Sequence, residues 1–176
     1  SAEEQARGVV CASAGNHAQG VAFSCAALKI QGVIYMPAIT PKQKINQVKM
    51  FGGEWIETVL VGDTFDACQE HALQFCHDHK RTFVPPFDHP LIIEGQGTVG
   101  KEILEEIDQI DFVFAPVGGG GLSAGIGQYL RTYSPKTKLI GVEPLGAPSM
   151  KQALAHGTPI VLDTIQRFVD GAAVKR

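Results

Sequence analysis

The stretch GVVCASAGNHAQGVAFSCAALK, residues 8–29, decides the fold expected of this chain. Its first residues form a short apolar run that predicts a strand. From His17 onward, apolar residues recur at three- and four-residue spacing, which predicts a helix. The polar segment SAGNHAQG, Ser13–Gly20, lies at the junction. Because a helix start leaves unpaired backbone N–H groups, this junction is suited to hold a negative or polar group.

The same alternation of strand and helix continues along the chain. Further strands are predicted at residues 32–37, 54–61, 111–117 and 138–144, and further helices at 41–52, 64–79, 91–107, 121–133 and 147–157. This strict alternation implies βαβ units and a parallel sheet. The Pro85-Pro86 pair halts regular structure, so we predict an α/β protein of two lobes, residues 1–86 and 87–176. Each lobe is expected to be a piece of parallel sheet flanked by helices.

The composition is ordinary for a globular α/β protein and excludes other classes. Of the 176 residues, 44% are hydrophobic and 19% are charged, with a net charge of −3 and no basic run. Nucleic acid is therefore not an expected partner. No apolar run approaches the roughly 20 residues that span a bilayer, so no membrane association is expected. The start of the chain, SAEEQARG, lacks the pattern of a signal peptide.

The four cysteines form no C-x-x-C pair, and we expect buried or half-buried free thiols in a reducing cytoplasm. His71, His77 and His79 lie near Cys76, but the spacing of His77 and His79 faces them differently on a helix. A solvated helix end is favoured over a zinc site there.

A run of four glycines forms the second junction of interest, PVGGGGLSAG at residues 116–125. It follows a predicted strand and opens a helix, where bare backbone and a positive helix end favour a phosphate. Gly119, Gly121 and Ala124 also fit a permissive dinucleotide pattern, with Glu143 as the acid that would bind a ribose. That alternative, a lobe of an oxidoreductase, explains the second junction but gives Ser13–Gly20 no role. Ser13 and Asn16 could also serve only as helix caps.

Taken together, the two junctions resemble the fold-type II pyridoxal-phosphate enzymes, which have Rossmann-like lobes. The resemblance is greatest to the biosynthetic threonine dehydratases, also called threonine ammonia-lyases. Five segments carry it, in order and over nearly the whole chain: SAGNHAQGVA, MPAITPKQKINQVKMFGGE, PPFDHPLIIEGQGT, VGGGGLSAG and VDGAAVKR.

The resemblance implies a role for each junction. The cofactor phosphate would be held by backbone N–H groups of Gly118, Gly119, Gly120, Gly121 and Leu122. Asn16 would hydrogen-bond the phenolic oxygen of the cofactor ring. The substrate carboxylate would be received by the loop Ser13, Ala14, Gly15, Asn16 and His17, in which the backbone of His17, not its ring, has the role.

The implied activity of the whole protein is conversion of L-threonine to 2-oxobutanoate and ammonia, in isoleucine biosynthesis. A cytoplasmic homo-oligomer, dimeric or tetrameric, is expected. A serine dehydratase or racemase of the same family remains an alternative.

Two features depart from the family pattern. No lysine of the chain stands in the family's Lys-x-Arg-Gly context, so the lysine that forms the Schiff base is expected upstream of Ser1. We therefore expect an internal fragment, incomplete at both ends of the fold and inactive alone. Glu143, in Val142-Glu143-Pro144, is a candidate cation ligand, but Ser149 stands where a second carboxylate is expected. A structural role for Glu143 is favoured.

Overall fold

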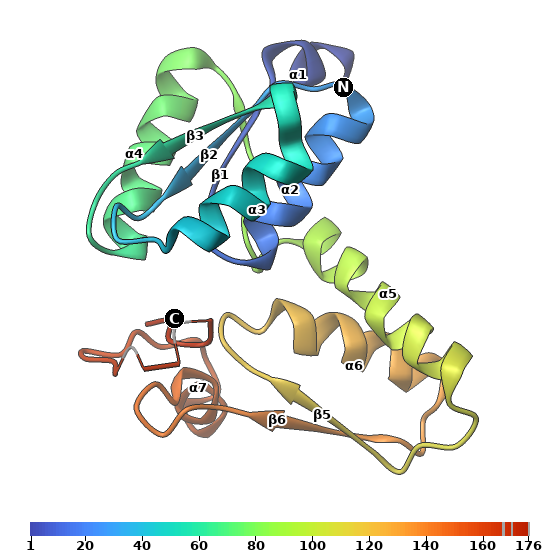
Figure 1. The fold of residues 1–176 in the computed structure, drawn as a ribbon. Helices are drawn as coiled ribbons and strands as arrows, with labels where there is room; N and C mark the ends of the chain where they lie inside the picture. Colours follow the sequence, from blue (N-terminus) through green and yellow to red (C-terminus); the bar gives the residue numbers. More distant parts are fainter. Residues whose placement is uncertain (167, 170, 176) are drawn as a thin grey trace. The chain divides into compact units, whose positions relative to one another are not determined.

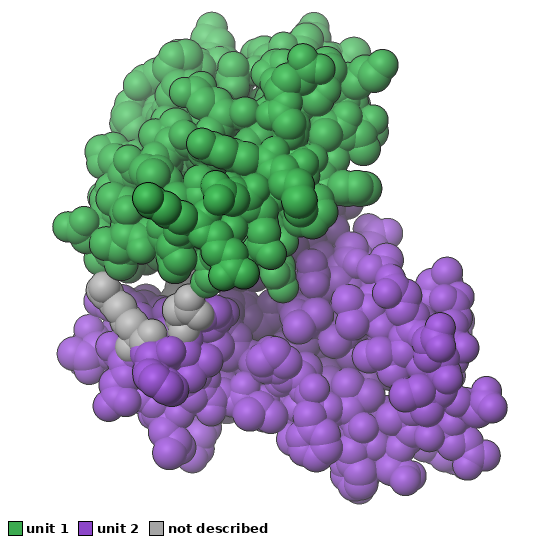
Figure 2. Space-filling view, in the orientation of Figure 1, with its two compact units in different colours: residues 1–86 green, residues 87–176 purple. Residues whose placement is uncertain are grey.

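A computed structural model describes residues 1–166, 168, 169 and 171–175. The chain divides into two compact units, residues 1–86 and residues 87–176 (Figures 1 and 2). Every strand pairing among the described residues is parallel, and helices flank both sheets. The predicted α/β class is therefore confirmed.

The first unit contains a four-stranded sheet in the order β3-β2-β1-β4. Its strands are β1 (Val9–Ala12), β2 (Gly32–Met36), β3 (Ile56–Leu60) and β4 (Thr82–Phe83). Val9 pairs with Gly32 on one side and with Thr82 on the other. The strand β4 was not predicted, because two residues are too few to show the alternation that identifies a strand.

Helices cover both faces of this sheet, as the ribbon in Figure 1 shows. One face packs against α2 (Asn16–Leu28) and α3 (Lys42–Gly52), and the other against α4 (Phe65–His79). Successive residues of the central strands point to opposite faces. The α2 side buries Cys11, Ile34 and Met36, and the α4 side buries Val10, Val33 and Tyr35. This two-sided burial is what a parallel sheet requires.

The four cysteines belong to these two cores. All four are free and buried, as predicted. Cys11 and Cys25 lie on the α2 side, and Cys68 and Cys76 on the α4 side. Burial raises the pKa of the Cys68 thiol to about 11 and raises the pKa of the other three. These thiols are therefore packing residues and not nucleophiles.

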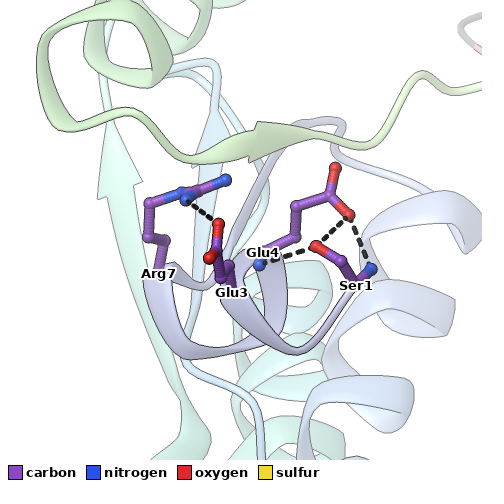
Figure 3. Close-up of polar contacts among 4 residues, drawn as sticks. All are labelled: Ser1, Glu3, Glu4 and Arg7. Carbon is purple, nitrogen blue, oxygen red and sulfur yellow. Dashed lines mark hydrogen bonds and ion pairs between the residues drawn. The ribbon is translucent and has the colours of Figure 1, made fainter.

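A short helix, α1 (Ala2–Arg7), precedes β1 and was not predicted. Its start is a capping box, drawn in Figure 3: the Ser1 hydroxyl accepts from the Glu4 N–H at 3.3 Å, and the Glu4 carboxylate accepts from Ser1. A weak ion pair of 3.9 Å joins Arg7 to Glu3. The local pattern Ser-x-x-Glu indicates such a start once it is looked for.

The second unit contains two parallel strands, β5 (Phe112–Pro116) and β6 (Lys138–Val142). Its helices are α5 (Pro90–Glu106), α6 (Gly121–Tyr133) and α7 (Ser149–His156). One face of the strands packs on α6, where Ala115, Ile126 and Leu130 are buried. On β5 the alternate residues Phe112 and Phe114 are exposed. The core of this unit therefore lies between the strands and the α5–α6 pair.

Candidate cofactor-binding and substrate-binding loops

The turn from β1 to α2 holds the first set of predicted site residues. Ser13 is buried, and its backbone N–H donates to the carbonyl of Tyr35 at 3.0 Å. Its hydroxyl oxygen accepts a hydrogen bond of 3.1 Å from the Gly15 N–H. This bond tightens the turn and leaves the hydroxyl proton available to a ligand.

The start of α2 carries no side-chain cap. Gly15 is the N-cap residue and Asn16 is the first helical residue. The alternative that Ser13 or Asn16 caps the helix is therefore wrong. The first backbone bond into the helix is from Gln19 to the Gly15 carbonyl, at 3.3 Å. Within the described part of the chain, no hydrogen bond is donated by the backbone N–H groups of residues 16–18.

His17 has its ring turned to the protein. Its Nε2 donates to the carbonyl oxygen of Val84 at 3.0 Å, which ties the turn to the residue after β4. Burial lowers the pKa of the imidazole, and the bond to Val84 only partly offsets this. The His17 ring, neutral and bonded to the Val84 carbonyl, therefore holds the loop in place. This arrangement is compatible with a backbone role for His17.

The turn from β5 to α6 is built from the four glycines. The Val117 N–H continues the ladder to Val142 at 2.9 Å, and the backbone then leaves the strand. Gly120 is the N-cap residue of α6 with φ +84°, a left-handed conformation that favours glycine, and no side chain caps the helix. Its carbonyl accepts from the Ala124 N–H at 2.9 Å and from the Ser123 hydroxyl at 3.0 Å.

This glycine loop, residues 118–122, combines open N–H groups with no room for side chains. None of its five N–H groups donates a backbone hydrogen bond to another described residue. A Cβ at Gly118 would lie 3.2 Å from the backbone of Ala172, and one at Gly120 would lie 2.9 Å from Met150. Bare N–H groups at a helix N-terminus suit a phosphate group. The loop therefore fits the cofactor phosphate that the sequence implied.

The Glu143 carboxylate binds the start of a helix, a contact that the sequence did not reveal. Its two carboxylate oxygens accept from the N–H groups of Met150 at 2.7 Å and Lys151 at 2.8 Å, at the start of α7. The N-cap residue there is Pro148, whose side chain cannot accept a hydrogen bond. Glu143 therefore caps α7, which favours the structural role over a ribose or cation site. No group of three or more metal-ligating side chains is found among the described residues.

The histidines after Cys76 lie at an exposed helix end. His77 is 85% exposed, and its Nδ1 lies 3.2 Å from an oxygen of Asp78. His79 contacts the carbonyl of Phe75 at 3.0 Å. These contacts fit the solvated helix end that the sequence favoured.

The family of this chain is evident from its whole length. Residues 1–176 match the family model described as pyridoxal-phosphate dependent enzyme. The chain belongs to the pyridoxal-phosphate dependent enzymes. This membership favours pyridoxal phosphate over the dinucleotide that the glycine loop had left open.

Relatives within the family have similar sequences. The chain is 56% identical over 175 residues to L-threonine dehydratase biosynthetic IlvA of Halalkalibacterium halodurans, covering 99% of this chain and 42% of that protein. It is 54% identical over 177 residues to the protein of the same name from Bacillus subtilis, covering 100% of this chain and 42% of that one. The chain thus spans about two fifths of the length of these relatives.

Solved structures in the family share the fold. The processed form of threonine deaminase isoform 2 from Solanum lycopersicum has a TM-score of 0.91 at 47% identity, over 99% of this chain and 50% of that one. Maize serine racemase has a TM-score of 0.89 at 29% identity, over 99% of this chain and 52% of that one. In the described part of this family member, no helix is both long and apolar enough to cross a membrane.

Proposed function

We propose that the protein containing this chain is a pyridoxal-phosphate-dependent threonine ammonia-lyase, which converts L-threonine to 2-oxobutanoate and ammonia in isoleucine biosynthesis. The observation that carries this proposal is the identity of 54–56% over 99–100% of the chain to proteins named biosynthetic L-threonine dehydratase. The proposal includes a cytoplasmic location and a homo-oligomeric state for the whole protein.

The glycine loop is proposed to bind the cofactor phosphate. The N–H groups of Gly118, Gly119, Gly120, Gly121 and Leu122 are open, and the N-terminus of α6 adds about half a positive charge. When bound, the cofactor supplies an electron sink for the electron pair left by the departing α-proton of the substrate.

The Ser13–His17 turn is proposed to bind the substrate carboxylate. The Ser13 hydroxyl already accepts from Gly15, so its own proton is free to be donated to a carboxylate oxygen. The open N–H groups of Asn16 and His17 are further donors at a positive helix end. The Asn16 side chain, on an exposed first residue of α2, is proposed to donate to the phenolic oxygen of the cofactor.

Proton transfer at the α-carbon needs a base that none of these residues supplies. Burial lowers the pKa of the His17 ring, which makes it a weak base, and the neutral Ser13 hydroxyl is not a base at neutral pH. We propose that the lysine with this role lies in the part of the protein outside residues 1–176, and that residues 1–176 alone do not catalyse the reaction.

The test uses the full-length protein with added pyridoxal phosphate. We expect 2-oxobutanoate from L-threonine, with a higher kcat/KM than for pyruvate formation from L-serine. Maize serine racemase, at 29% identity, makes racemisation the specific competing activity. Formation of D-serine without 2-oxobutanoate would overturn the proposed substrate and reaction. A second assay, of residues 1–176 alone, should give no 2-oxobutanoate.

A further inference from the structure

The aromatic side chain of Phe87 packs against the glycine loop from within the same unit. We propose that Phe87 is a positioning residue that holds the loop in the conformation that binds phosphate. The inference rests on the proposed function, because it takes the loop to be the phosphate site. Phe87 follows Pro86 directly and precedes α5, and no role was assigned to it from the sequence.

The contact between Phe87 and the loop is close at two glycines. A Cβ added to Gly119 would overlap the Phe87 ring at Cγ and both Cδ atoms. A Cβ added to Gly121 would lie 2.9 Å from the Phe87 carbonyl oxygen and 3.0 Å from its Cα and Cβ. The atoms met are the inner ring atoms and the backbone, which cannot turn aside as the tip of a long side chain can. The loop and Phe87 therefore fit each other without spare space.

The backbone of Phe87 is fixed by the start of α5. Its carbonyl accepts from the His89 N–H at 3.1 Å. His89 is the N-cap residue of α5, and its Nδ1 accepts from the Leu91 N–H at 3.3 Å. The His89 carbonyl also accepts from Ile92 and Ile93, each at 3.0 Å. Moving Phe87 away from the loop would thus disturb the first turn of α5.

Beyond Phe87, the loop packs against Ala172 at Gly118 and against Met150 at Gly120. Four glycines have the greatest conformational freedom of any residues, and no side chain caps α6. An ordered set of N–H groups that point at one anion therefore needs an external support. Phe87 supplies this support, with its ring against Gly119 and its backbone and Cβ against Gly121. Truncating the ring is expected to weaken phosphate binding without removing any atom that touches the ligand.

The test is a double-mutant cycle in the full-length protein, with Phe87→Ala, Gly119→Ala and the double variant. The affinities for pyridoxal phosphate and for pyridoxal, which lacks the phosphate, are measured by absorbance titration. Phe87→Ala should lower the affinity for pyridoxal phosphate about tenfold and leave the affinity for pyridoxal unchanged. The N–H groups that lose their alignment donate only to the charged phosphate. Gly119→Ala should lower the affinity for pyridoxal phosphate further. The double variant should bind pyridoxal phosphate more tightly than Gly119→Ala, because the ring no longer occupies the space of the new methyl group.

Controls separate this inference from general destabilisation. Phe87→Leu, a milder truncation, is the substitute if Phe87→Ala does not fold. Gly95 in α5 has nothing within 4 Å of the position that a methyl group would take, so Gly95→Ala should combine additively with either Phe87 variant. Urea unfolding of each apoprotein should show the same rescue of Gly119→Ala by Phe87→Ala, independent of cofactor.

Each failure has a distinct meaning. If the wild type binds pyridoxal phosphate no tighter than pyridoxal, the loop is not the phosphate site and the proposed cofactor site is overturned with the inference. If the wild type prefers the phosphorylated form, but the Phe87 variants keep that preference and do not rescue Gly119→Ala, the positioning role is overturned and the proposed function stands.

Discussion

Two of the turns that join a strand to a helix in the first unit, β1–α2 and β3–α4, begin their helices differently. At the β3–α4 turn, the Thr64 hydroxyl accepts from the Ala67 N–H at 3.1 Å and caps α4. At the β1–α2 turn, no side chain caps α2, and the Ser13 hydroxyl binds the Gly15 N–H outside the helix. A side-chain cap stabilises a helix by about 1 kcal/mol. The β1–α2 turn lacks this stabilisation, and its N–H groups stay available to bind a ligand.

The same contrast occurs in the second unit. α5 is capped by the His89 ring and α7 by the Glu143 carboxylate, whereas α6, with Gly120 as its N-cap residue, has no side-chain cap. α3 also lacks a cap, but its first residues are exposed, so water can satisfy their N–H groups. Open N–H groups at partly buried helix starts thus mark the two turns proposed to bind ligands.

The largest effect is expected from Ser13→Ala in the full-length protein. It removes a hydroxyl proposed to donate to the substrate carboxylate, so kcat/KM for L-threonine should fall about tenfold to a hundredfold. The urea midpoint should fall only slightly, because Ser13 caps no helix and its hydroxyl accepts one hydrogen bond, from the Gly15 N–H. A variant that loses stability but keeps its kcat/KM would show that the β1–α2 turn is only structural.

Asn16→Ala should lower turnover about tenfold, through the loss of one hydrogen bond to the proposed cofactor oxygen. The visible absorption of the bound cofactor should shift, because the phenolic oxygen loses a donor. Cofactor affinity should change less than in Gly119→Ala. Unchanged spectrum and rate would rule out the contact between Asn16 and the ring.

Glu143→Ala should lower the free energy of unfolding by about 1–2 kcal/mol, since it removes two charge-assisted hydrogen bonds at the start of α7. Chemical denaturation with and without added Mg²⁺ measures this effect. Equal losses under both conditions fit a cap, and a loss seen only with the cation would favour the ligand role.

Thr64→Ala is the reciprocal of the Ser13 experiment. It removes a side-chain cap, so stability should fall by about 1 kcal/mol while kcat/KM stays at the wild-type value. Thr64→Ser retains the hydroxyl and should retain most of the stability. If Thr64→Ala loses activity under conditions in which it is fully folded, the distinction between turns with a side-chain cap and turns without one does not hold.

The smallest effect concerns pH and His17. Burial lowers the pKa of His17 below its ordinary value of 6.5, so the unfolded chain takes up the proton more readily. Its contribution to stability is complete above the ordinary pKa and is lost as the pH falls below it. The urea midpoint of the wild type should therefore fall more steeply below about pH 6.5 than that of His17→Gln. Parallel pH curves for the two proteins would contradict this.

Strong local patterns predicted most of the secondary structure. The apolar runs that became β1, β2 and β5 and the three- and four-residue spacing in α2 and α4 depend only on neighbours in sequence. The helix predicted at 64–79 has Thr64 as its N-cap residue in the structure. The helix α1 was missed although Ser1 and Glu4 form a capping box, and β4 was missed because it is held mainly by pairing with β1.

The residues of the two candidate loops were chosen from sequence because glycines and small polar residues follow strands there. Sequence could not say whether Ser13 and Asn16 cap α2, because a capping residue and a ligand-binding residue have the same chemistry. Nor could it assign Glu143, whose partners lie seven and eight residues along the chain beyond a turn.

By itself, the sequence determined the parallel α/β class, the place of the two loops after strands, and membership of the family, because each follows from local pattern or from residue identity. Only the tertiary structure decided which helix starts stay open, that Glu143 caps α7, and that Phe87 packs beneath Gly119 and Gly121. These depend on which groups meet in space, and hydrogen bonds and packing act over a few ångströms that the order of residues does not specify.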